Sequence, residues 1–344
     1  MPSPIPATRL LPKDLYPSPD TGTCSSPLAK YSGDATLKVP VHNFPRRAAG
    51  RLWSSVVQWK ELRSMQPIGS GGFGSVYKAR YLGETVAVKT VKKCAKNKLA
   101  SRQSFWAELH AADLRHANVV RVIAASACVP STLEHENSIG TVVMEYAGSR
   151  NLHSVIYGST EAIAADRWLA YATDIVRGLG FLHSHGVVHL DLKPANVLVS
   201  KDGVCKIADF GCSLKLDKAC EGGGAAAAAA AGRPPSPAGG TYTHRAPELL
   251  KGERVTAKAD IFSFGITLWQ LLVREQPYTG DRHHILYAVV AHNLRPPVQG
   301  KPAFQTGRGR ACETLVCRCW SGDAPSRPSA PALLGHLDEM RTHS

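Results

Sequence analysis

The chain has 344 residues, 44% of them hydrophobic, and a formal net charge of +14. This length allows about two domains or one two-lobed unit with a substantial core. Nine cysteines, an odd number with no export signal before them, favour free thiols in a reducing compartment over a disulfide framework. The most apolar segment, 261–273, is interrupted by polar residues and is shorter than the about 20 residues of a membrane span, so the sequence predicts no membrane anchor.

Residues 1–58 are rich in proline and serine and show no sustained periodicity. A segment of this composition buries too little apolar surface to fold alone. We therefore expect a disordered extension, followed by a structured domain over 59–340. The prolines at the start interrupt any continuous apolar stretch, which argues against a signal peptide.

The stretch "IGSGGFGSVYKA" (68–79) spaces three glycines as Gly69, Gly71 and Gly74. Glycine lets backbone N–H groups approach anionic oxygens closely, and this spacing occurs in more than one kind of nucleotide-binding fold. A dinucleotide-binding fold would open a helix directly after the third glycine. Here a strand follows instead, and "ETVAVKTV" (84–91) also alternates as a strand. We expect a hairpin that folds down over phosphates.

The run "KTVKKCAKNKLASR" (89–102) carries six basic side chains and no acid. It forms either a solvated loop or a docking surface for an acidic partner. Aromatic side chains are not interleaved there as single-strand nucleic-acid binding would favour, so we expect no nucleic-acid partner.

Hydrophobic periodicity predicts the next elements. An amphipathic helix is expected over 104–116 and a buried strand over 141–148, and "NVLVSKDGVCKIADF" contains two short strands joined through Asp202 and Gly203. A longer helix is expected over 168–183. Its inward-facing residues, and those of the first helix, are Leu169, Ala172, Ile175, Val176, Leu179 and Leu182, and Phe105, Leu109 and Ala112.

Strands dominate the first third of the chain and helices dominate the rest. This order predicts an α+β fold, with a small antiparallel β-rich lobe that holds one helix and a larger α-helical lobe. The expected ligand site lies in a cleft between the two lobes. Residues 221–240, "EGGGAAAAAAAGRPPSPAGG", are of low complexity, and their alanine run is too short to nucleate a helix in water. We expect a flexible surface insertion there.

Four further motifs follow the glycine loop: "VAVK" ending at Lys89, "HLDLKPAN" at 189–196, "DFG" at 209–211 and "APE" at 246–248. With them, residues 59–340 resemble a eukaryotic protein kinase. The resemblance implies a two-lobed enzyme that uses ATP and Mg²⁺ and transfers the γ-phosphate to a protein hydroxyl. In this chemistry the protein mainly positions groups and neutralises charge.

The resemblance implies four catalytic side chains. Lys89 supplies a cation for the α- and β-phosphates, and Glu108 is its ion-pair partner. Asp191 accepts the proton of the substrate hydroxyl, and Lys193 lies near the transferred phosphate. The alternative for Lys89 and Glu108 is a surface charge, which the mid-strand position of Lys89 argues against. The alternative for the other two is a capped loop before a strand.

The resemblance also implies the residues that bind nucleotide and metal. Asn196 and Asp209 offer hard oxygen ligands suited to Mg²⁺. Adenine is expected between apolar side chains, with Met144 behind it and hinge backbone groups beside it, although each of these residues is also a credible core residue. The implied nucleotide-binding set is Ile68, Gly69, Ser70, Gly71, Gly72, Phe73, Gly74, Val76, Ala87, Lys89, Met144, Glu145, Ala147 and Leu198.

The motif "DLKPAN" and the stretch "GTYTHRAPE" resemble serine/threonine kinases and not tyrosine kinases. The resemblance then implies three structural roles. Thr241 braces the catalytic aspartate and lysine, Asp260 holds the catalytic loop, and Glu248 forms a buried ion pair with Arg327.

Two positions depart from the family pattern. Leu190 stands where many regulated kinases have an arginine that clasps a phosphate on the activation segment. We therefore predict activity that does not require such phosphorylation. Phe262 replaces the usual tryptophan, which is a tolerable aromatic exchange. The insertion at 221–240 lies between "DFG" and "APE", inside the activation segment.

At finer grain, "QPIGSGGFGSVYKA", "SFWAELHAADLRH" and "HILYAVVAHNLRP" resemble one subfamily of serine/threonine kinases. That resemblance implies a cytoplasmic germ-cell kinase whose protein substrate is a MAP kinase kinase and which maintains the meiotic arrest of the egg. We expect a monomer with no membrane partner. The alternatives are a pseudokinase-like scaffold of the same pathway and, more distantly, a basic nucleic-acid binder.

Overall fold

The structure is a computed structural model that describes six stretches of the chain: residues 57–71, 74–92, 98–127, 138–159, 161–216 and 241–342. All of them belong to one unit, residues 51–344. The predicted extension up to residue 56 and the predicted insertion at 221–240 lie outside the described residues. Val57 is already buried at 2% exposure, so the packed part of the domain begins slightly before the expected residue 59.

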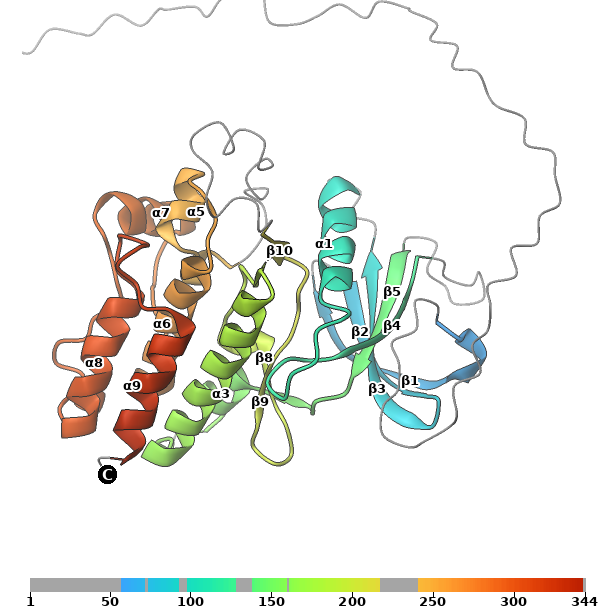
Figure 1. Ribbon diagram of the computed structural model, residues 1–344, viewed down its shortest axis with the longest axis horizontal. Coiled ribbons are helices and arrows are strands. Elements are labelled where there is room, and N and C mark those ends of the chain that lie inside the picture. Colours follow the sequence, from blue (N-terminus) through green and yellow to red (C-terminus); the bar gives the residue numbers. More distant parts are fainter. Residues whose placement is uncertain are drawn as a thin grey trace, which may run out of the picture. The chain divides into compact units, whose positions relative to one another are not determined.

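The N-terminal lobe is a five-stranded antiparallel sheet with strand order β1-β2-β3-β5-β4 (Figure 1). A short 3₁₀ turn, η1, precedes it, and one helix, α1, accompanies it. The bounds are η1 Trp59–Glu61, β1 Leu62–Gly71, β2 Gly74–Tyr81, β3 Glu84–Lys92, α1 Lys98–His110, β4 Val122–Ser126 and β5 Ser138–Glu145. The predicted hairpin is confirmed, because β1 and β2 pair up to Gly71 opposite Gly74.

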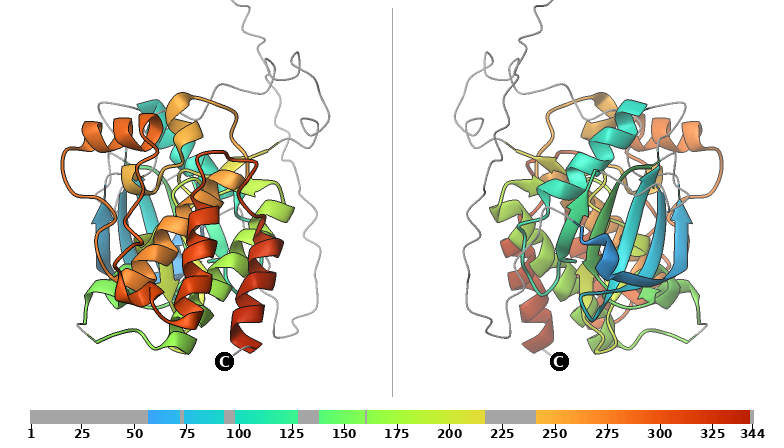
Figure 2. Two further views of the ribbon diagram at one scale, coloured as in Figure 1. Left: turned by 90° about the vertical axis from the view of Figure 1, so that its left-hand side faces the viewer. Right: turned by 90° about the vertical axis from the view of Figure 1, so that its right-hand side faces the viewer.

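Side-chain alternation along β3 divides the lobe into two apolar clusters. Val86 and Val88 point to one face of the sheet and pack with Tyr81. Val91 points to the other face and packs with Phe105 of α1. Figure 2 shows α1 crossing that face of the sheet. Lys89 lies two residues before Val91 in the same strand, so its side chain points to the same face and enters the space between the sheet and α1.

Helix α1 differs in its bounds from the predicted helix over 104–116. It starts six residues earlier, at Lys98, and ends six residues earlier, at His110. Beyond His110 the backbone N–H groups of Ala112 and Leu114 bond to carbonyls three residues back instead of four, which closes the helix in tight turns. Ala112 is buried as expected, at 4% exposure, although it lies in the turn.

The C-terminal lobe is mainly helical. Its helices are α2 Leu152–Tyr157, α3 Ala165–Ser184, α5 Pro247–Lys251, α6 Lys258–Val273, α7 Arg282–Ala291, α8 Gly307–Cys319 and α9 Ala330–Thr342. Its short strands and 3₁₀ turns are β6 Arg150–Asn151, β7 Val187–Val188, β8 Val197–Val199, β9 Cys205–Ile207, β10 Leu214–Lys215, η2 Pro194–Asn196, η4 Tyr242–His244 and η5 Pro302–Phe304. The predicted α+β architecture is confirmed.

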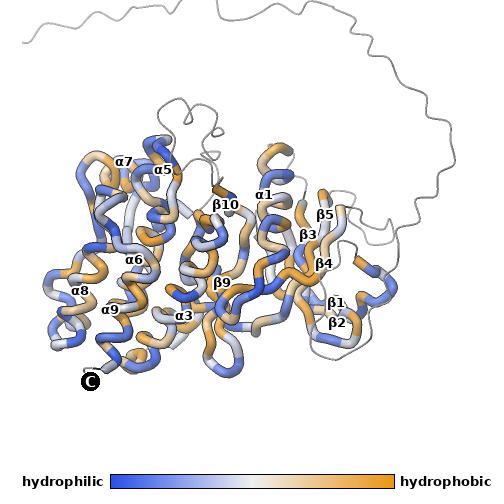
Figure 3. The backbone as a smooth tube through the Cα atoms, viewed as in Figure 1, coloured by the Kyte–Doolittle hydropathy of each residue, from blue (hydrophilic) through white to orange (hydrophobic). Residues whose placement is uncertain are grey.

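Two helices supply the centre of this lobe. In α3 all six predicted inward-facing side chains are buried, and α6 is buried from residue 259 through residue 271. Hydrophobic and hydrophilic stretches alternate along the helices and strands (Figure 3). No helix in the described part of the chain is long and apolar enough to cross a membrane.

The predicted turn at Asp202 and Gly203 joins β8 to β9. Gly203 has φ of +79°, a left-handed conformation that glycine adopts without strain. The two strands pair antiparallel, with Val197 opposite Ile207, so the residues just before β8 and just after β9 come close together. Asn196 precedes β8 and Asp209 follows β9, and the Ala208 N–H donates to the Asn196 backbone carbonyl at 2.9 Å.

Candidate active site

Lys89 is the first side chain around which the site is built. It is only 6% exposed, and its Nζ contacts the Glu108 carboxylate of α1. The same Nζ donates to Asp209 Oδ1 at 2.6 Å. The predicted pairing of Lys89 with Glu108 is therefore present, and neither residue is a surface charge. Lys89 is therefore buried and cannot form part of a docking surface made by the basic run 89–102. Residues 93–97 of that run lie outside the described stretches.

The charges around Lys89 set the protonation of the site. Burial by itself would lower the pKa of Lys89, but the carboxylates of Glu108 and Asp209 outweigh burial and raise that pKa above its ordinary value. Burial would likewise raise the pKa of Asp209, and the neighbouring Lys89 ammonium lowers it to about 2 instead. At neutral pH the site therefore presents a fixed cation next to an ionised carboxylate.

Asp191 is the second centre, on the loop before β8. It is 6% exposed, and both carboxylate oxygens accept hydrogen bonds. The Thr241 N–H donates to Oδ1 at 2.7 Å, while Lys193 Nζ and Asn196 Nδ2 donate to Oδ2 at 2.9 and 3.0 Å. Lys193 Nζ also donates to Thr241 Oγ1 at 2.5 Å. The expected bracing of the aspartate and the lysine by Thr241 is confirmed.

Asp260, the third residue of α6, holds the loop that carries Asp191. It is fully buried, and its two carboxylate oxygens accept the backbone N–H groups of His189 and Leu190, each at 2.8 Å. Burial opposes ionisation of Asp260, but hydrogen bonds from His183 and the loop lower its pKa below the ordinary value. The predicted loop-holding role of Asp260 is confirmed by these contacts.

The strands of the N-terminal lobe place the apolar residues that were expected around adenine. Val76 lies opposite Lys89 in the β2–β3 pairing, and Ala87 lies opposite Met144 in the β3–β5 pairing. Ala87 and Lys89 share one face of the sheet by alternation. Met144 and Leu198 both pack on one small cluster formed by Val120, Ala147 and Ala208. Val76, Ala87 and Met144 therefore share one face of the sheet with Lys89.

The glycine hairpin reaches this face from β1 and β2. Gly69 pairs with Val76, and Ser70 pairs with Ser75. Ile68 is 49% exposed, so its side chain is accessible to a ligand. Gly74 has φ of +156°, and a Cβ there would lie 1.9 Å from the Thr90 carbonyl oxygen, so only glycine fits. Gly72 and Phe73 lie outside the described residues.

Glu145 has a structural use beyond the backbone role expected of it. Its carboxylate accepts the Arg121 N–H at 2.9 Å and Lys206 Nζ at 3.0 Å. The carboxylate thus ties the end of β5 to β9. The backbone N–H of Glu145 donates to the Arg121 carbonyl at 2.9 Å, and the expected role of the Glu145 backbone beside adenine stays a prediction.

Two independent comparisons bear on what this arrangement is. Residues 62–337 match the family model described as "Protein kinase domain". The chain belongs to the protein kinase family. It is 49% identical to the serine/threonine-protein kinase mos of Gallus gallus over 99% of both chains. It is 52% identical to that of Xenopus laevis over 98% of this chain and 93% of the relative. It is 48% identical to the proto-oncogene serine/threonine-protein kinase mos of Sus scrofa over 99% of both.

These relatives confirm the finer resemblance of the sequence, and they support a serine/threonine kinase similar to mos. Membership of the protein kinase family implies the use of ATP and, typically, of a divalent cation. The residues fit such a cation, because Asn196 and the partly exposed Asp209, 39% exposed in its side chain, bring oxygen donors to neighbouring positions. Among the described residues no group of three or more histidine, cysteine or acidic side chains is arranged for a metal. A kinase cation would take further ligands from water and phosphate.

Away from the site, the kinase fold contains the predicted ion pair of Glu248 and Arg327. Two guanidinium nitrogens of Arg327 donate to the two Glu248 oxygens at 2.6 and 2.7 Å. The Arg327 side chain is completely buried and packs its guanidinium over the Phe262 ring, 5.1 Å from the centroid. Phe262 therefore keeps an aromatic face for this arginine in place of tryptophan.

Sequence reasoning missed His189, the first residue of the catalytic-loop motif. His189 is fully buried, and its Nδ1 accepts the Asp191 N–H at 3.3 Å, so its proton lies on Nε2, which is 3.0 Å from the Ala208 carbonyl oxygen. Its ring stands edge-on to Phe210 at 5.2 Å. His189 thus links the loop of Asp191 to the segment of Asp209. Its place in "HLDLKPAN" was the available signal.

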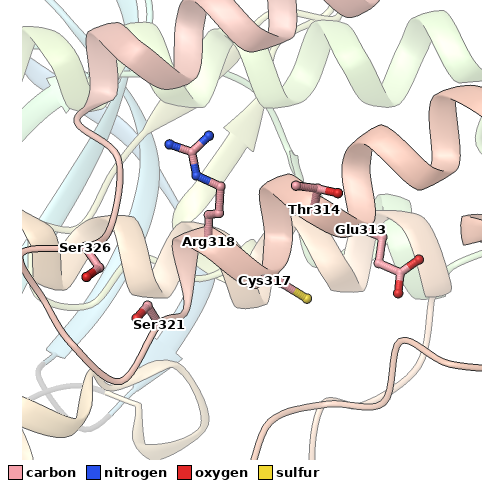
Figure 4. A pocket seen from close by; sticks show the side chains of 6 residues that line it. All are labelled: Glu313, Thr314, Cys317, Arg318, Ser321 and Ser326. Carbon is pink, nitrogen blue, oxygen red and sulfur yellow. The ribbon is translucent and has the colours of Figure 1, made fainter.

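Two surface pockets lie elsewhere on the helical lobe. Figure 4 shows one of them, formed by α8 and the turn that follows it. The other lies between α2, the end of α6 and η5. Neither contains a residue expected in the active site. The candidate active site is therefore defined by converging side chains and not by these pockets.

Proposed function

We propose that the chain transfers the γ-phosphate of ATP, bound with Mg²⁺, to serine or threonine hydroxyls of a MAP kinase kinase. The observation that carries this proposal is the contact of Lys89 Nζ with Asp209 Oδ1 at 2.6 Å, between residues 120 positions apart in the chain. It brings the expected phosphate-binding cation against the expected metal ligand. The MAP kinase kinase substrate, the cytoplasmic location, the monomeric state and the role in the egg rest on the resemblance to mos.

In the proposed reaction Asp191 accepts the proton of the substrate hydroxyl. Hydrogen bonds to both of its oxygens fix the orientation of the carboxylate. Lys193, bridging Asp191 and Thr241, is placed to neutralise charge on the phosphoryl group in transit.

Lys89 would bind phosphate oxygens, and Glu108 would keep its flexible stem in place. Asp209 and Asn196 would hold the magnesium ion, which supplies further neutralisation of phosphate charge when bound. Val76, Ala87 and Leu198 would enclose the base, and hinge backbone groups would orient it. Each role agrees with the burial and contacts described above.

The decisive experiment measures phosphate transfer from labelled ATP to a catalytically dead MAP kinase kinase. We expect Asp191→Asn and Lys89→Arg to lower the rate by about 10²–10⁴-fold. Lys251→Arg, a matched substitution on the exposed end of α5, should keep the parental rate. An unrelated protein substrate should be labelled much more slowly than the MAP kinase kinase.

Equal labelling by the parent and by Lys89→Arg would remove the proposed activity. Intact pathway signalling by both inactive variants would instead support the scaffold alternative. The presence of Lys89, Asp191, Asn196 and Asp209 together favours the enzyme.

A further inference from the structure

The surroundings of Asp191 carry an excess of positive charge that the proposed transfer does not use. The catalytic loop contributes Lys193, the residue after η4 is Arg245, and the first residue of α7 is Arg282. The acids on these elements are Asp191 and Asp281. Asp191 accepts bonds from its own neighbours, and Asp281 Oδ1 accepts the N–H groups at the start of α7, at 2.8 and 3.1 Å.

Contacts place the two arginines along one short path from the catalytic carboxylate. Thr241, whose N–H binds Asp191, is followed by Tyr242, and the Arg282 guanidinium lies over the Tyr242 ring, 5.7 Å from its centroid. The Arg245 N–H donates to the Tyr242 carbonyl at 3.4 Å and closes the turn. A single turn therefore connects Asp191 with the Arg282 guanidinium and with the backbone of Arg245.

The two arginines differ in exposure in a way that suits recognition of an anion. Arg245 is partly buried, and burial is the main cause that lowers its pKa; the nearby Arg282 adds to this, while Cys212 and Asp191 oppose it. Arg282 is exposed and forms no salt bridge with the acids in the described part of the chain. Its guanidinium, held by the tyrosine ring, offers a planar fork that matches carboxylate and phosphate oxygens.

We propose that Arg245 and Arg282 form an acid-recognition subsite that selects protein substrates with a negative side chain close to the acceptor serine or threonine. This proposal rests on the phosphotransfer proposed above and names the substrate chemistry that the same site prefers. An extended peptide advances about 3.3–3.6 Å per residue, so side chains one to three positions from the acceptor pass along η4 toward α7. The negative group is either a carboxylate or a phosphate already on the substrate.

The test uses the full chain and four peptides that share one acceptor serine. At the positions one to three residues from it the peptides carry glutamate, phosphoserine, alanine or arginine. We expect kcat/KM for the glutamate peptide to exceed that for the alanine peptide by about tenfold, mainly through KM. A larger preference for phosphoserine than for glutamate would identify phosphate as the better ligand. Equal preferences for the two would show that the subsite recognises negative charge alone.

Substitutions locate the preference. Arg282→Ala should reduce the preference for glutamate to within about threefold, and Arg282→Glu should favour the arginine peptide, with the alanine peptide little changed. Arg310→Glu, a matched charge reversal on the exposed surface of α8, should leave the preference intact. Arg245→Gln should also reduce it. Retention of the full preference by Arg282→Glu, or its loss in Arg310→Glu, would overturn the subsite.

Binding of fluorescent peptides to the chain without ATP separates this proposal from the proposed function. Tighter binding of the glutamate peptide, lost in Arg282→Glu, supports the subsite even if no phosphate is transferred. Transfer with equal kcat/KM for the glutamate and alanine peptides would reject the subsite and leave the kinase activity in place. An unchanged unfolding midpoint of Arg282→Glu confirms that its effect is local.

Discussion

The clusters around Lys89 and Arg327 both place a cation against carboxylates inside the protein, yet they are built differently. Lys89 faces two carboxylates, and one of them, Asp209, has a side chain that is 39% exposed. Arg327 faces only Glu248, and both side chains are almost completely buried. The Lys89 cluster is therefore open to a phosphate ligand, whereas the Arg327 pair is closed.

Hydrogen bonding sharpens the difference. The Arg327 guanidinium donates to both Glu248 oxygens and also to the carbonyls of Lys258 and Ser321, each at 2.9 Å. Lys89 has a single ammonium on a flexible stem and can exchange one carboxylate for another anion. A buried ion pair thus serves binding when one partner remains accessible, and serves structure when each nitrogen of the cation already donates to a protein oxygen.

The largest expected effect is on stability, at the closed pair. Arg327→Lys removes the two-pronged contact with Glu248 and leaves buried groups unsatisfied, so we expect the free energy of unfolding to fall by about 3–5 kcal/mol. Urea denaturation measures it. Arg341→Lys, at the exposed pair with Asp338, is the matched control and should change stability by less than about 0.5 kcal/mol. A loss below that of the control would contradict the structural role of Arg327.

The open cluster should show the opposite pattern. Lys89→Arg keeps a positive charge but displaces it from the phosphate position, so we expect kcat to fall by about 10²–10³-fold. The loss of unfolding free energy should be smaller than for Arg327→Lys. Both quantities are measured on the same preparation. If Lys89→Arg unfolded the protein as readily as Arg327→Lys does, the contrast between the two clusters would be lost.

Lowering the pH should destabilise the part of the protein near the closed Arg327 pair before it affects the open Lys89 cluster. His244 lies four residues before Glu248; it is buried, and burial lowers its pKa to about 4, below the ordinary 6.5. The unfolded chain therefore takes up this proton first as the pH falls. The contribution of neutral His244 to the free energy of unfolding is complete above pH 6.5 and is lost between pH 6.5 and 4. At pH 5 the loss amounts to about 2 kcal/mol. Asp209, with its pKa near 2, loses its contribution only at lower pH.

Unfolding of the parent and of His244→Gln at pH 7, 6 and 5 checks this expectation. The glutamine cannot take up a proton in this range, so the stability of the variant should fall less steeply with acid than that of the parent. Parallel curves for the two proteins would show that His244 does not carry the dependence.

The smallest expected effect concerns Leu190. Its side chain is buried at 8% exposure and carries no charge that could clasp a phosphate, and the loop is already held by Asp260 through backbone bonds. Complete dephosphorylation, verified by mass spectrometry, should therefore change kcat by less than about twofold. A large loss of activity would show that a phosphate supports the loop in another way.

Local patterns predicted much of the fold. Alternation identified β3 and the place of Lys89 within it, and helical periodicity identified the buried side of α3, because both patterns depend only on neighbouring residues. The predicted ends of α1 were wrong. The segment after His110 contains alanine and leucine that continue the apolar pattern, and only the tertiary fold decides that they turn.

The candidate site was predicted through motifs, and its long-range contacts were less accessible. No spacing fixes the approach of Glu108 to Lys89, which depends on how α1 crosses the sheet. The bond between His189 Nε2 and the Ala208 carbonyl, and the use of the Glu145 carboxylate between Arg121 and Lys206, also join separate segments of the chain. Such contacts follow from the assembled fold and have no local signature.

The structural role of Gly74 limits what can be inferred from a glycine at this position of the loop. The absent side chain leaves space for the neighbouring strand, since any β-carbon would overlap the Thr90 carbonyl oxygen. A descendant of this protein that had stopped handling nucleotides would still need glycine at this position to keep its sheet intact. The third glycine of the loop therefore reports on strand packing, and its presence alone is no sign that catalysis has been retained.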